Sequence, residues 1–218
     1  MPGTLSKLVQ RAQRRTSKLR VLCQEFEAAK NFSQKDVLAT FIAIENANLW
    51  DAFARTLYLT CAMDGPATSK GLAITHAHSP FADDRDALLF AIDAVNKTHA
   101  AKLRASGQKI RSRDEPAWQD RNVLLRIVRA LGLSNEPSIS AAISASVTTL
   151  ANLPTIRNFY AHRCEDTALK TAAVQLGYGF ASSIHPTQFL ASRLAARPYT
   201  ILRHLVDDIG ISTAIACS

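Results

Sequence analysis

The run VLATFIAIENANLWDAFARTLYL, residues 37–59, constrains the fold more than any other part of the chain because it is long and mostly apolar. It predicts a helix that begins near Ser33, a residue type that caps helix N-termini, and that ends near Cys61. Such a helix should lie at the centre of the fold, so polar groups on it need hydrogen-bond partners, or they line a dimer seam or a cleft. One stripe of the helix contains four residues at helical spacing: Asn46, Trp50, Phe53 and Leu57.

The composition favours helices over strands. Glycine and proline number only eight each in 218 residues, which argues against a loop-rich all-β design. Hydrophobic residues make up 47% of the chain, so a sizeable core can form. We therefore expect an all-α fold, a bundle of about six to eight helices. In this fold residues 1–30 form a basic N-terminal helix that extends a helical domain over residues 31–218.

Capping residues and glycines place the remaining helices. We expect them from Asp83 or Asp84 to about Arg104, over roughly 116–132 with Gly132 at the end, from Ser138 onward, near 166–176 and from about Pro198, with a short piece after Pro186. The segment MDGPATSKG, residues 63–71, is a turn or loop by composition, and a short hairpin or an extended loop is expected near 70–80. Pro154 breaks or kinks the helix after Ser138, or it starts the next helix.

The chain carries a net charge of +8, and its cations are unevenly distributed. This balance suits a polyanionic partner such as nucleic acid, or an anionic membrane surface. Residues 102–129 are rich in lysine and arginine, whereas residues 36–100 are net acidic. Five cations of the N-terminal helix recur at three- and four-residue steps and form a candidate RNA-binding ridge: Lys7, Arg11, Arg14, Arg15 and Lys18. The same ridge also fits an ordinary solvated helix face.

The sequence indicates no membrane span, secretion signal or metal site. No apolar run approaches the roughly 20 residues that a membrane-spanning helix requires, and no apolar segment follows the basic N-terminus. The four cysteines form no CxxC or zinc-type pair, so we expect reduced, mostly buried thiols in a cytoplasmic protein. His76 and His78 have no cysteine or carboxylate beside them to complete a metal site, so we expect no metal and no cofactor.

The stretch LPTIRNFYAHRCEDTA, residues 153–168, holds the candidate reactive residues: Arg157, Asn158, Tyr160 and His162. If Pro154 occupies the first position of a helix, Arg157 lies near its first turn, where free backbone N–H groups favour a phosphate. The planar arginine fork fits phosphate oxygens. Asn158 and His162 share a helix face because they are four residues apart, and histidine exchanges protons near neutral pH.

These residue types suit the cleavage of RNA without a metal ion. A base removes the proton from the ribose 2′-OH, the oxygen attacks the adjacent phosphorus, and a cation stabilises the charge that develops on the phosphoryl oxygens. An acid protonates the leaving 5′ oxygen. The motif has one histidine, whereas the reaction needs a base and an acid, and two copies across a symmetric dimer would supply both. Spacing alone also fits an exposed arginine and histidine on an ordinary helix.

The hexapeptide RNFYAH matches the Arg-Asn-x-x-x-His signature of the HEPN superfamily, and the longer RNFYAHRCEDTA resembles its RiboL-PSP-type branch. The upstream segment IENANLWDAFAR, residues 44–55, is similar to the first conserved helix of these proteins. The resemblance implies a dimerising α-helical bundle that acts as a metal-independent endoribonuclease with a composite cleft between subunits. It further implies a role as a toxin or as an antiviral defence effector, in some members paired with a nucleotidyltransferase-like antitoxin.

Carried onto this chain, the resemblance assigns catalytic roles to Arg157, Asn158 and His162, and it places Tyr160 at a variable motif position. An upstream acidic residue faces the cleft in some members. Glu45 is the candidate here, with Asp51 as the alternative, and burial of Glu45 against an arginine remains open. The expected partners are an RNA substrate, a second copy of the chain and an antitoxin. A non-catalytic HEPN-fold module that binds RNA, a nucleotide or a protein stays open, as does an unrelated helical interaction protein.

Overall fold

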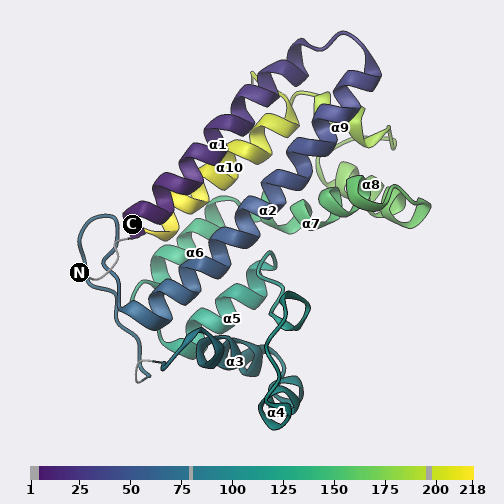
Figure 1. Cartoon of the computed structure of the whole chain (residues 1–218). Helices are drawn as coiled ribbons and strands as arrows, with labels where there is room; N and C mark the ends of the chain where they lie inside the picture. The colour runs from purple at the N-terminus through teal and green to yellow at the C-terminus, as the bar shows by residue number, and fades with distance from the viewer. Residues whose placement is uncertain (1–4, 79–80, 195–197) are drawn as a thin grey trace. The chain divides into compact units, whose positions relative to one another are not determined.

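The computed structural model describes residues 5–78, 81–194 and 198–218, and Figure 1 follows the chain through them. The expectation of an all-α fold is confirmed, because these residues form α-helices, one short 3₁₀ helix and no strand. The segment near 70–80 is a loop with one isolated antiparallel bridge, between Ala67 and Ala73. Residues 79 and 80 of the predicted hairpin or loop lie outside the described ranges.

Ten α-helices follow one another along the described chain, more than the expected range. They are α1 (Leu5–Ala28), α2 (Phe32–Asp64), α3 (Asp84–Val95), α4 (Lys97–Ser106), α5 (Arg121–Leu131), α6 (Glu136–Ala145), α7 (Val147–His162), α8 (Glu165–Gly177), α9 (Pro186–Ala191) and α10 (Ile201–Ala216). The 3₁₀ helix η1 covers Ser112–Asp114. One reason for the larger number of helices is that the helix predicted from Asp83 or Asp84 to Arg104 is divided into α3 and α4 at Asn96. The Asn96 side chain accepts a hydrogen bond from the His99 backbone N–H and so caps α4.

Local signals placed some helix ends correctly and others wrongly. Asp83 caps α3 and Gly132 ends α5 in the left-handed conformation, with φ +67°, as predicted. The predicted cap at Ser33 is wrong, because Asn31 Oδ1 accepts the hydrogen bond from the backbone N–H of the third helical residue at 2.8 Å. The predicted cap at Ser138 is also wrong, because α6 begins two residues earlier and the Ser138 hydroxyl donates to a backbone carbonyl elsewhere in the chain.

Pro154 neither ends a helix nor starts one. It lies inside α7, which begins at Val147. Arg157 is therefore near the middle of α7, far from its free N–H groups, and the predicted phosphate site at a helix N-terminus is wrong. The helix predicted after Ser138 is interrupted earlier instead, at Ser146, between α6 and α7.

The described chain divides into two compact units. Unit 1 consists of Met1–Ala12, Trp50–Ala145 and Ser212–Ser218, and unit 2 consists of Gln13–Leu49 and Ser146–Ile211. The helices α1, α2 and α10 contribute residues to both. Leu5 is buried in unit 1 and Phe26 is buried in unit 2, so α1 is an integral part of the fold. The division at residue 30 into an extension and a main domain stays a prediction.

In unit 1, α3 packs beside α4 and α5 (Figure 1). Side chains of α2 hold this arrangement from one edge. The Tyr58 hydroxyl donates to the Ala87 carbonyl of α3 at 2.6 Å. The Arg55 guanidinium makes a bidentate contact with Glu115, at 2.6 and 2.9 Å. These bonds fix the segment that follows η1 to α2.

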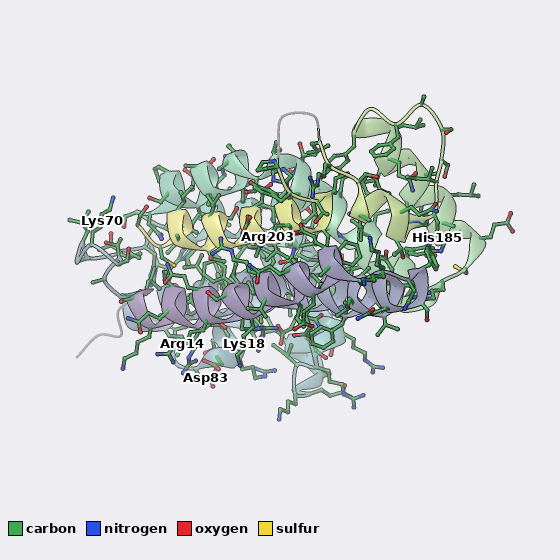
Figure 2. All side chains as sticks on the ribbon, turned by 90° about the horizontal axis from the view of Figure 1, so that it is seen from above. Arg14, Lys18, Lys70, Asp83, His185 and Arg203 are labelled. Carbon is green, nitrogen blue, oxygen red and sulfur yellow. The ribbon has the colours of Figure 1, made fainter. Side chains whose placement is uncertain are left out.

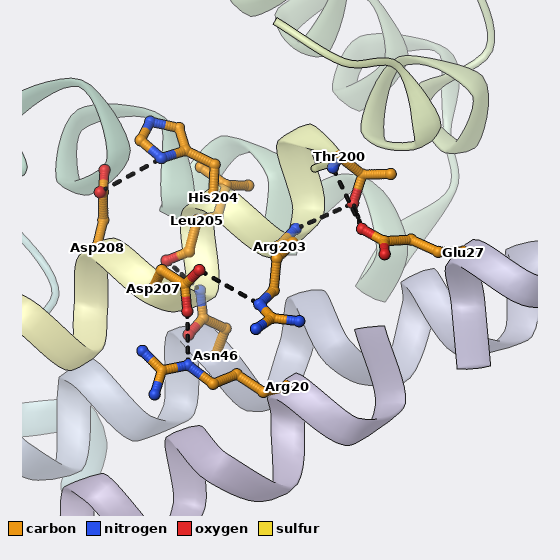
Figure 3. A network of polar contacts seen from close by, with 9 residues as sticks. All are labelled: Arg20, Glu27, Asn46, Thr200, Arg203, His204, Leu205, Asp207 and Asp208. Atoms are coloured by element: carbon orange, nitrogen blue, oxygen red, sulfur yellow. Dashed lines mark hydrogen bonds and ion pairs between the residues drawn. The ribbon is translucent and has the colours of Figure 1, made fainter. Parts of the chain in front are cut away.

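In unit 2, a polar network joins α1, α2 and α10 (Figure 3). Asp207 of α10 accepts from Arg20 Nε of α1 at 2.6 Å and from Arg203 Nε at 3.2 Å. Asn46 of α2 donates to the Leu205 carbonyl at 3.2 Å. The whole stripe predicted for α2 is buried: Asn46, Trp50, Phe53 and Leu57. The Nδ2 group of the buried Asn46 amide therefore has its partner in a backbone carbonyl of α10, whereas Oδ1 has no hydrogen-bond partner.

None of the described helices is both long and apolar enough to cross a membrane by itself. The bent pair formed by α6 and α7 meets the length and composition criteria only when the two helices are taken together.

Candidate functional site

The helix α7, in unit 2, carries the four residues of the predicted motif and presents them on different sides. Its buried stripe includes Leu153, Ile156 and Tyr160. Successive residues of an α-helix are turned by about 100°. Asn158 and His162 consequently share a face roughly opposite the buried stripe, whereas Arg157 lies on the flank, about 140° from His162 around the helix axis.

A hydrogen bond between neighbours draws Arg157 toward the face that carries the histidine. Its Nη1 donates to Asn158 Oδ1 at 3.1 Å, and both side chains are half-buried. His162 is the last residue of α7 and is exposed, and its side chain forms no hydrogen bond or ion pair with any described residue. The motif thus presents an unengaged imidazole, and beside it an amide that orients a guanidinium.

Tyr160 occupies a different environment from the rest of the motif. It is buried, and its hydroxyl lies 3.0 Å from Thr187 Oγ1 of α9. Burial raises the pKa of Tyr160 well above that of a free phenol. This tyrosine packs α7 onto α9 and does not face the side of α7 on which His162 lies.

Glu45 lies at a pocket that neither Arg157 nor His162 lines. Its Oε2 is 3.1 Å from Arg15 Nη2, and its Oε1 accepts from Asn48 Nδ2 at 3.2 Å. The pocket has a volume of about 420 Å³ and is lined by Val37, Thr40, Phe41, Ile44, Glu45 and Arg163. The sequence left two roles open for Glu45, a carboxylate that faces the cleft or one that pairs with an arginine. Within this chain it pairs with Arg15. Asp51, the other acidic candidate, belongs to unit 1.

Arg163, the residue that follows the motif, anchors the end of α7 to α2, and the motif pattern did not predict this contact. Arg163 donates from Nη1 to Asp36 Oδ2 of α2 at 2.7 Å, and from Nη2 to the Thr40 hydroxyl. Thr187 donates to the other oxygen of Asp36. Burial raises the pKa of Asp36, but these hydrogen bonds and the charge of Arg163 outweigh it, so the pKa lies below its usual value. One carboxylate therefore connects the ends of α2, α7 and α9 next to His162.

The candidate RNA-binding ridge lies along α1, and its members differ in exposure. Arg14 and Lys18 are exposed and project from the same side of the helix (Figure 2). Lys7 and Arg11 are also exposed, whereas Arg15 is half-buried and paired with Glu45. The opposite side of α1 supplies core residues, listed here in chain order: Leu5, Val9, Ala12, Leu19, Cys23 and Phe26. Four exposed cations thus stay available for phosphates, within a helix that the core fixes in place.

The described residues include no group of three or more His, Cys, Asp or Glu side chains that could hold a metal ion. His78 Nε2 lies 3.2 Å from the Ala130 carbonyl, and His76 Nδ1 is buried without a hydrogen-bond partner. The His76 ring stacks on Phe81, and the His78 ring contacts Phe90 of α3 edge-on.

Comparisons with models of protein families, with curated proteins and with solved structures found no match to this chain.

Proposed function

We propose that this chain is a metal-independent endoribonuclease of the HEPN type, in which Arg157, Asn158 and His162 act on the phosphodiester bond. The observation that carries this function is the exposed, unengaged imidazole of His162 on the face of α7 that Asn158 shares. Asn158 in turn orients the Arg157 guanidinium. In a metal-free attack by the 2′ oxygen, an imidazole can transfer protons, a permanent cation can stabilise the charge on the phosphoryl oxygens, and an amide can orient that cation.

The proposed reaction uses the imidazole for proton transfer and the guanidinium for charge. An imidazole takes the proton of the ribose 2′-OH, and the oxygen forms a bond to the adjacent phosphorus. The bond from phosphorus to the 5′ oxygen breaks, and a protonated imidazole gives its proton to that oxygen. Arg157 stabilises the charge on the phosphoryl oxygens. The products are a 2′,3′-cyclic phosphate and a free 5′-hydroxyl.

A second copy of the chain completes the proposed site. Each chain offers one motif histidine, and helix geometry turns Arg157 about 140° from it. Two copies related by a twofold axis bring two imidazoles and two guanidinium groups to one cleft. Val37 and Phe41 on α2 remain 66% and 53% exposed, and such apolar side chains support a surface that another protein covers. We propose a homodimer that works in the cytoplasm as a toxin or antiviral defence effector held in check by an antitoxin.

The decisive experiment is digestion of RNA in the presence of EDTA by the full-length chain and its variants. We expect cleavage with cyclic phosphate ends. His162→Ala should lower the rate by at least about 100-fold and Arg157→Ala by a similar factor. His78→Ala is the matched control, because His78 is an exposed histidine of unit 1 that lies outside the motif and outside the basic segments of the chain. Equal cleavage by the parent and by folded His162→Ala would exclude the proposed chemistry.

The second candidate function is a non-catalytic RNA-binding module of the same fold. It is favoured by the engagement of Tyr160 with Thr187 and of Glu45 with Arg15, which leaves neither side chain free for reaction. RNA bound with a steep salt dependence but left intact by the parent chain would support this module. Light scattering of the purified chain tests the dimer separately.

A further inference from the structure

A second run of basic residues lies in unit 1, on α4, on η1 and on the loop between them. Residues 97–113 contain no aspartate or glutamate. Five of their cations are exposed and form no ion pair with a described residue: Lys97, Lys102, Lys109, Arg111 and Arg113. We call these five the α4–η1 surface. Arg104, the remaining cation of the segment, is neutralised by Asp93 at 2.8 Å.

The acidic residues that border the α4–η1 surface have other partners. Asp114 lies 3.8 Å from His99 Nε2 and accepts the backbone N–H of Arg111 at 3.0 Å. Glu115 is held by Arg55 and by the Trp118 indole N–H. The Arg55 guanidinium neutralises Glu115, so of these two carboxylates only Asp114 offsets the five cations, and the surface keeps a net positive charge for an anionic ligand.

The loop between α4 and η1 packs against the fold and is not an extended run of solvent-exposed charged residues. Ile110 packs on a buried cluster formed by Leu89, Ile92, Ala100 and Leu103. Its neighbours Lys109 and Arg111 are exposed. Gly107 turns the chain with φ +62°, a conformation that favours glycine, and brings the loop back onto α3 and α4. The backbone that carries Lys109 and Arg111 is therefore packed before any ligand arrives, which reduces the entropy lost on binding.

The chemistry of the surface points to phosphates more than to bases or lipids. Residues 97–113 contain no phenylalanine, tyrosine or tryptophan, so the ring of His99 is the only one in the segment, and it lies beside Asp114. The large exposed hydrophobic residues of the described chain all lie outside this segment, so nothing here would insert into a membrane. Exposed lysine and arginine with no exposed large apolar side chain in the same segment match a ligand that presents a regular array of phosphates.

We propose that the α4–η1 surface binds the phosphate backbone of double-helical RNA without regard to sequence. The choice of RNA as the ligand rests on the proposed function. The inference adds the substrate class, which is a folded RNA that unit 1 binds at a double-helical segment. Neither the N-terminal ridge nor the motif on α7 contributes residues to this surface.

The test is binding of the full-length chain to a labelled 2′-O-methyl RNA duplex of about 16 base pairs, followed by fluorescence anisotropy at several salt concentrations. The methyl group blocks the attacking oxygen, so the readout does not depend on cleavage. We expect Lys102→Glu/Lys109→Glu/Arg111→Glu to weaken binding at least tenfold. The same variant should make the slope of log K against log salt shallower by about three, one for each lost phosphate contact.

The single variants Lys109→Glu and Lys70→Glu form a charge-matched pair, because Lys70 is an exposed lysine of unit 1 outside the surface, and Lys70→Glu is the control. We expect it to change the affinity less than about twofold, with circular dichroism confirming that every variant is folded. Three outcomes would overturn the inference. They are an unchanged affinity and slope in the triple variant, strong dependence on duplex sequence, and binding to anionic phospholipid vesicles but not to the duplex. If the duplex binds as expected but no RNA is cut, only the proposed catalysis fails.

Discussion

Arg163 forms an ion pair with Asp36 across 127 positions of sequence, with Nη1 2.7 Å from Oδ2. Arg163 is also the residue that ends α7, in the left-handed conformation with φ 47°. Its guanidinium lies over the ring of Tyr160 at 5.6 Å. The position of His162 at the end of α7 therefore depends on a carboxylate in the first turns of α2.

Replacing Asp36 by asparagine should make the stability of the fold less sensitive to acid. The pKa of Asp36 is lowered in the folded state, so its contribution is present above the ordinary aspartate pKa of about 3.9 and is lost as the pH falls through the lower folded value. We expect Asp36→Asn to cost about 1–3 kcal/mol at pH 7, because the hydrogen bonds to a charged acceptor are weakened.

Urea unfolding of parent and Asp36→Asn between pH 2 and 7 checks this expectation. The two curves of unfolding free energy should converge as the pH falls below about 4. Asp93→Asn provides the control, because Asp93 forms a more exposed pair with Arg104 and should cost less than about 1 kcal/mol. Parallel pH curves for the parent and Asp36→Asn would contradict a stabilising role for the ionised Asp36.

A pair of substitutions at Arg163 separates the ion pair from the backbone conformation. Both Arg163→Ala and Arg163→Gly remove the contact with Asp36. Only alanine retains a Cβ at φ 47°, a conformation that glycine adopts without strain. We expect the glycine variant to be more stable than the alanine variant by about 1 kcal/mol, as measured by thermal or urea unfolding. Equal stabilities would mean that the end of α7 changes conformation once the ion pair is lost.

Tyr160→Phe should affect stability more than RNA cleavage. The substitution removes a buried hydroxyl that contacts Thr187, which costs about 1 kcal/mol of unfolding free energy. The ring still packs between α7 and α9, so His162 should keep its place, and cleavage should fall by less than about threefold. A loss of activity comparable to that of His162→Ala, in a folded variant, would make Tyr160 a participant in the reaction.

Helical periodicity and local capping chemistry predicted much of the fold, because both depend on residues close together in sequence. The buried stripe of α2 follows from spacing alone, and the ends at Asp83 and Gly132 follow from their side chains. The cap of α2 was misplaced because Asn31 and Ser33 are both good capping residues, and sequence does not decide between them.

The surroundings of the motif could not be predicted, because they depend on contacts between distant segments. Nothing in the local pattern shows that Asp36 would meet Arg163, or that Tyr160 would turn toward Thr187. Proline is a strong breaker in isolated helices, yet tertiary packing keeps Pro154 inside α7. A resemblance of six residues identifies candidate reactive groups, but it does not provide the carboxylate that anchors the end of their helix.

The four cysteines should differ sharply in reactivity. Cys23, Cys61 and Cys217 are buried, and burial raises the pKa of each thiol to about 12. Cys164 is exposed at the start of α8, and the hydrogen bond with the Thr167 hydroxyl lowers its pKa. This pattern confirms the prediction of mostly buried thiols.

Iodoacetamide at pH 7.5 should therefore label only Cys164 in the native chain, and all four cysteines after unfolding in guanidinium. Peptide mass spectrometry identifies the labelled sites. Because the thiolate is the reactive form, the labelling rate of Cys164 should reach half its maximum below the ordinary thiol pKa of about 8.5. Native labelling of Cys61 at a comparable rate would contradict the buried environment.

Close packing of α1 on α10 in unit 2 can be tested with a double-mutant cycle at Gly210 and Thr16. A Cβ added at Gly210 would lie 2.9 Å from Thr16 Cγ2, closer than real Cβ contacts allow. Gly210→Ala gains up to about 1 kcal/mol of helix propensity but should lose about 1–3 kcal/mol to overpacking, so we expect net destabilisation. Thr16→Ser removes the methyl group that obstructs the new Cβ and alone should cost about 1 kcal/mol.

In the double variant the alanine Cβ occupies the space that the threonine methyl group vacates. Its loss of unfolding free energy should therefore be smaller than the sum of the two single losses by about 1 kcal/mol or more. Urea unfolding of the four proteins measures this coupling, and Gly177→Ala serves as a control because a Cβ there meets no atom within 4 Å. Additive losses would show that α1 and α10 move apart to accept the alanine. The close approach of the two helices would then not depend on glycine at position 210.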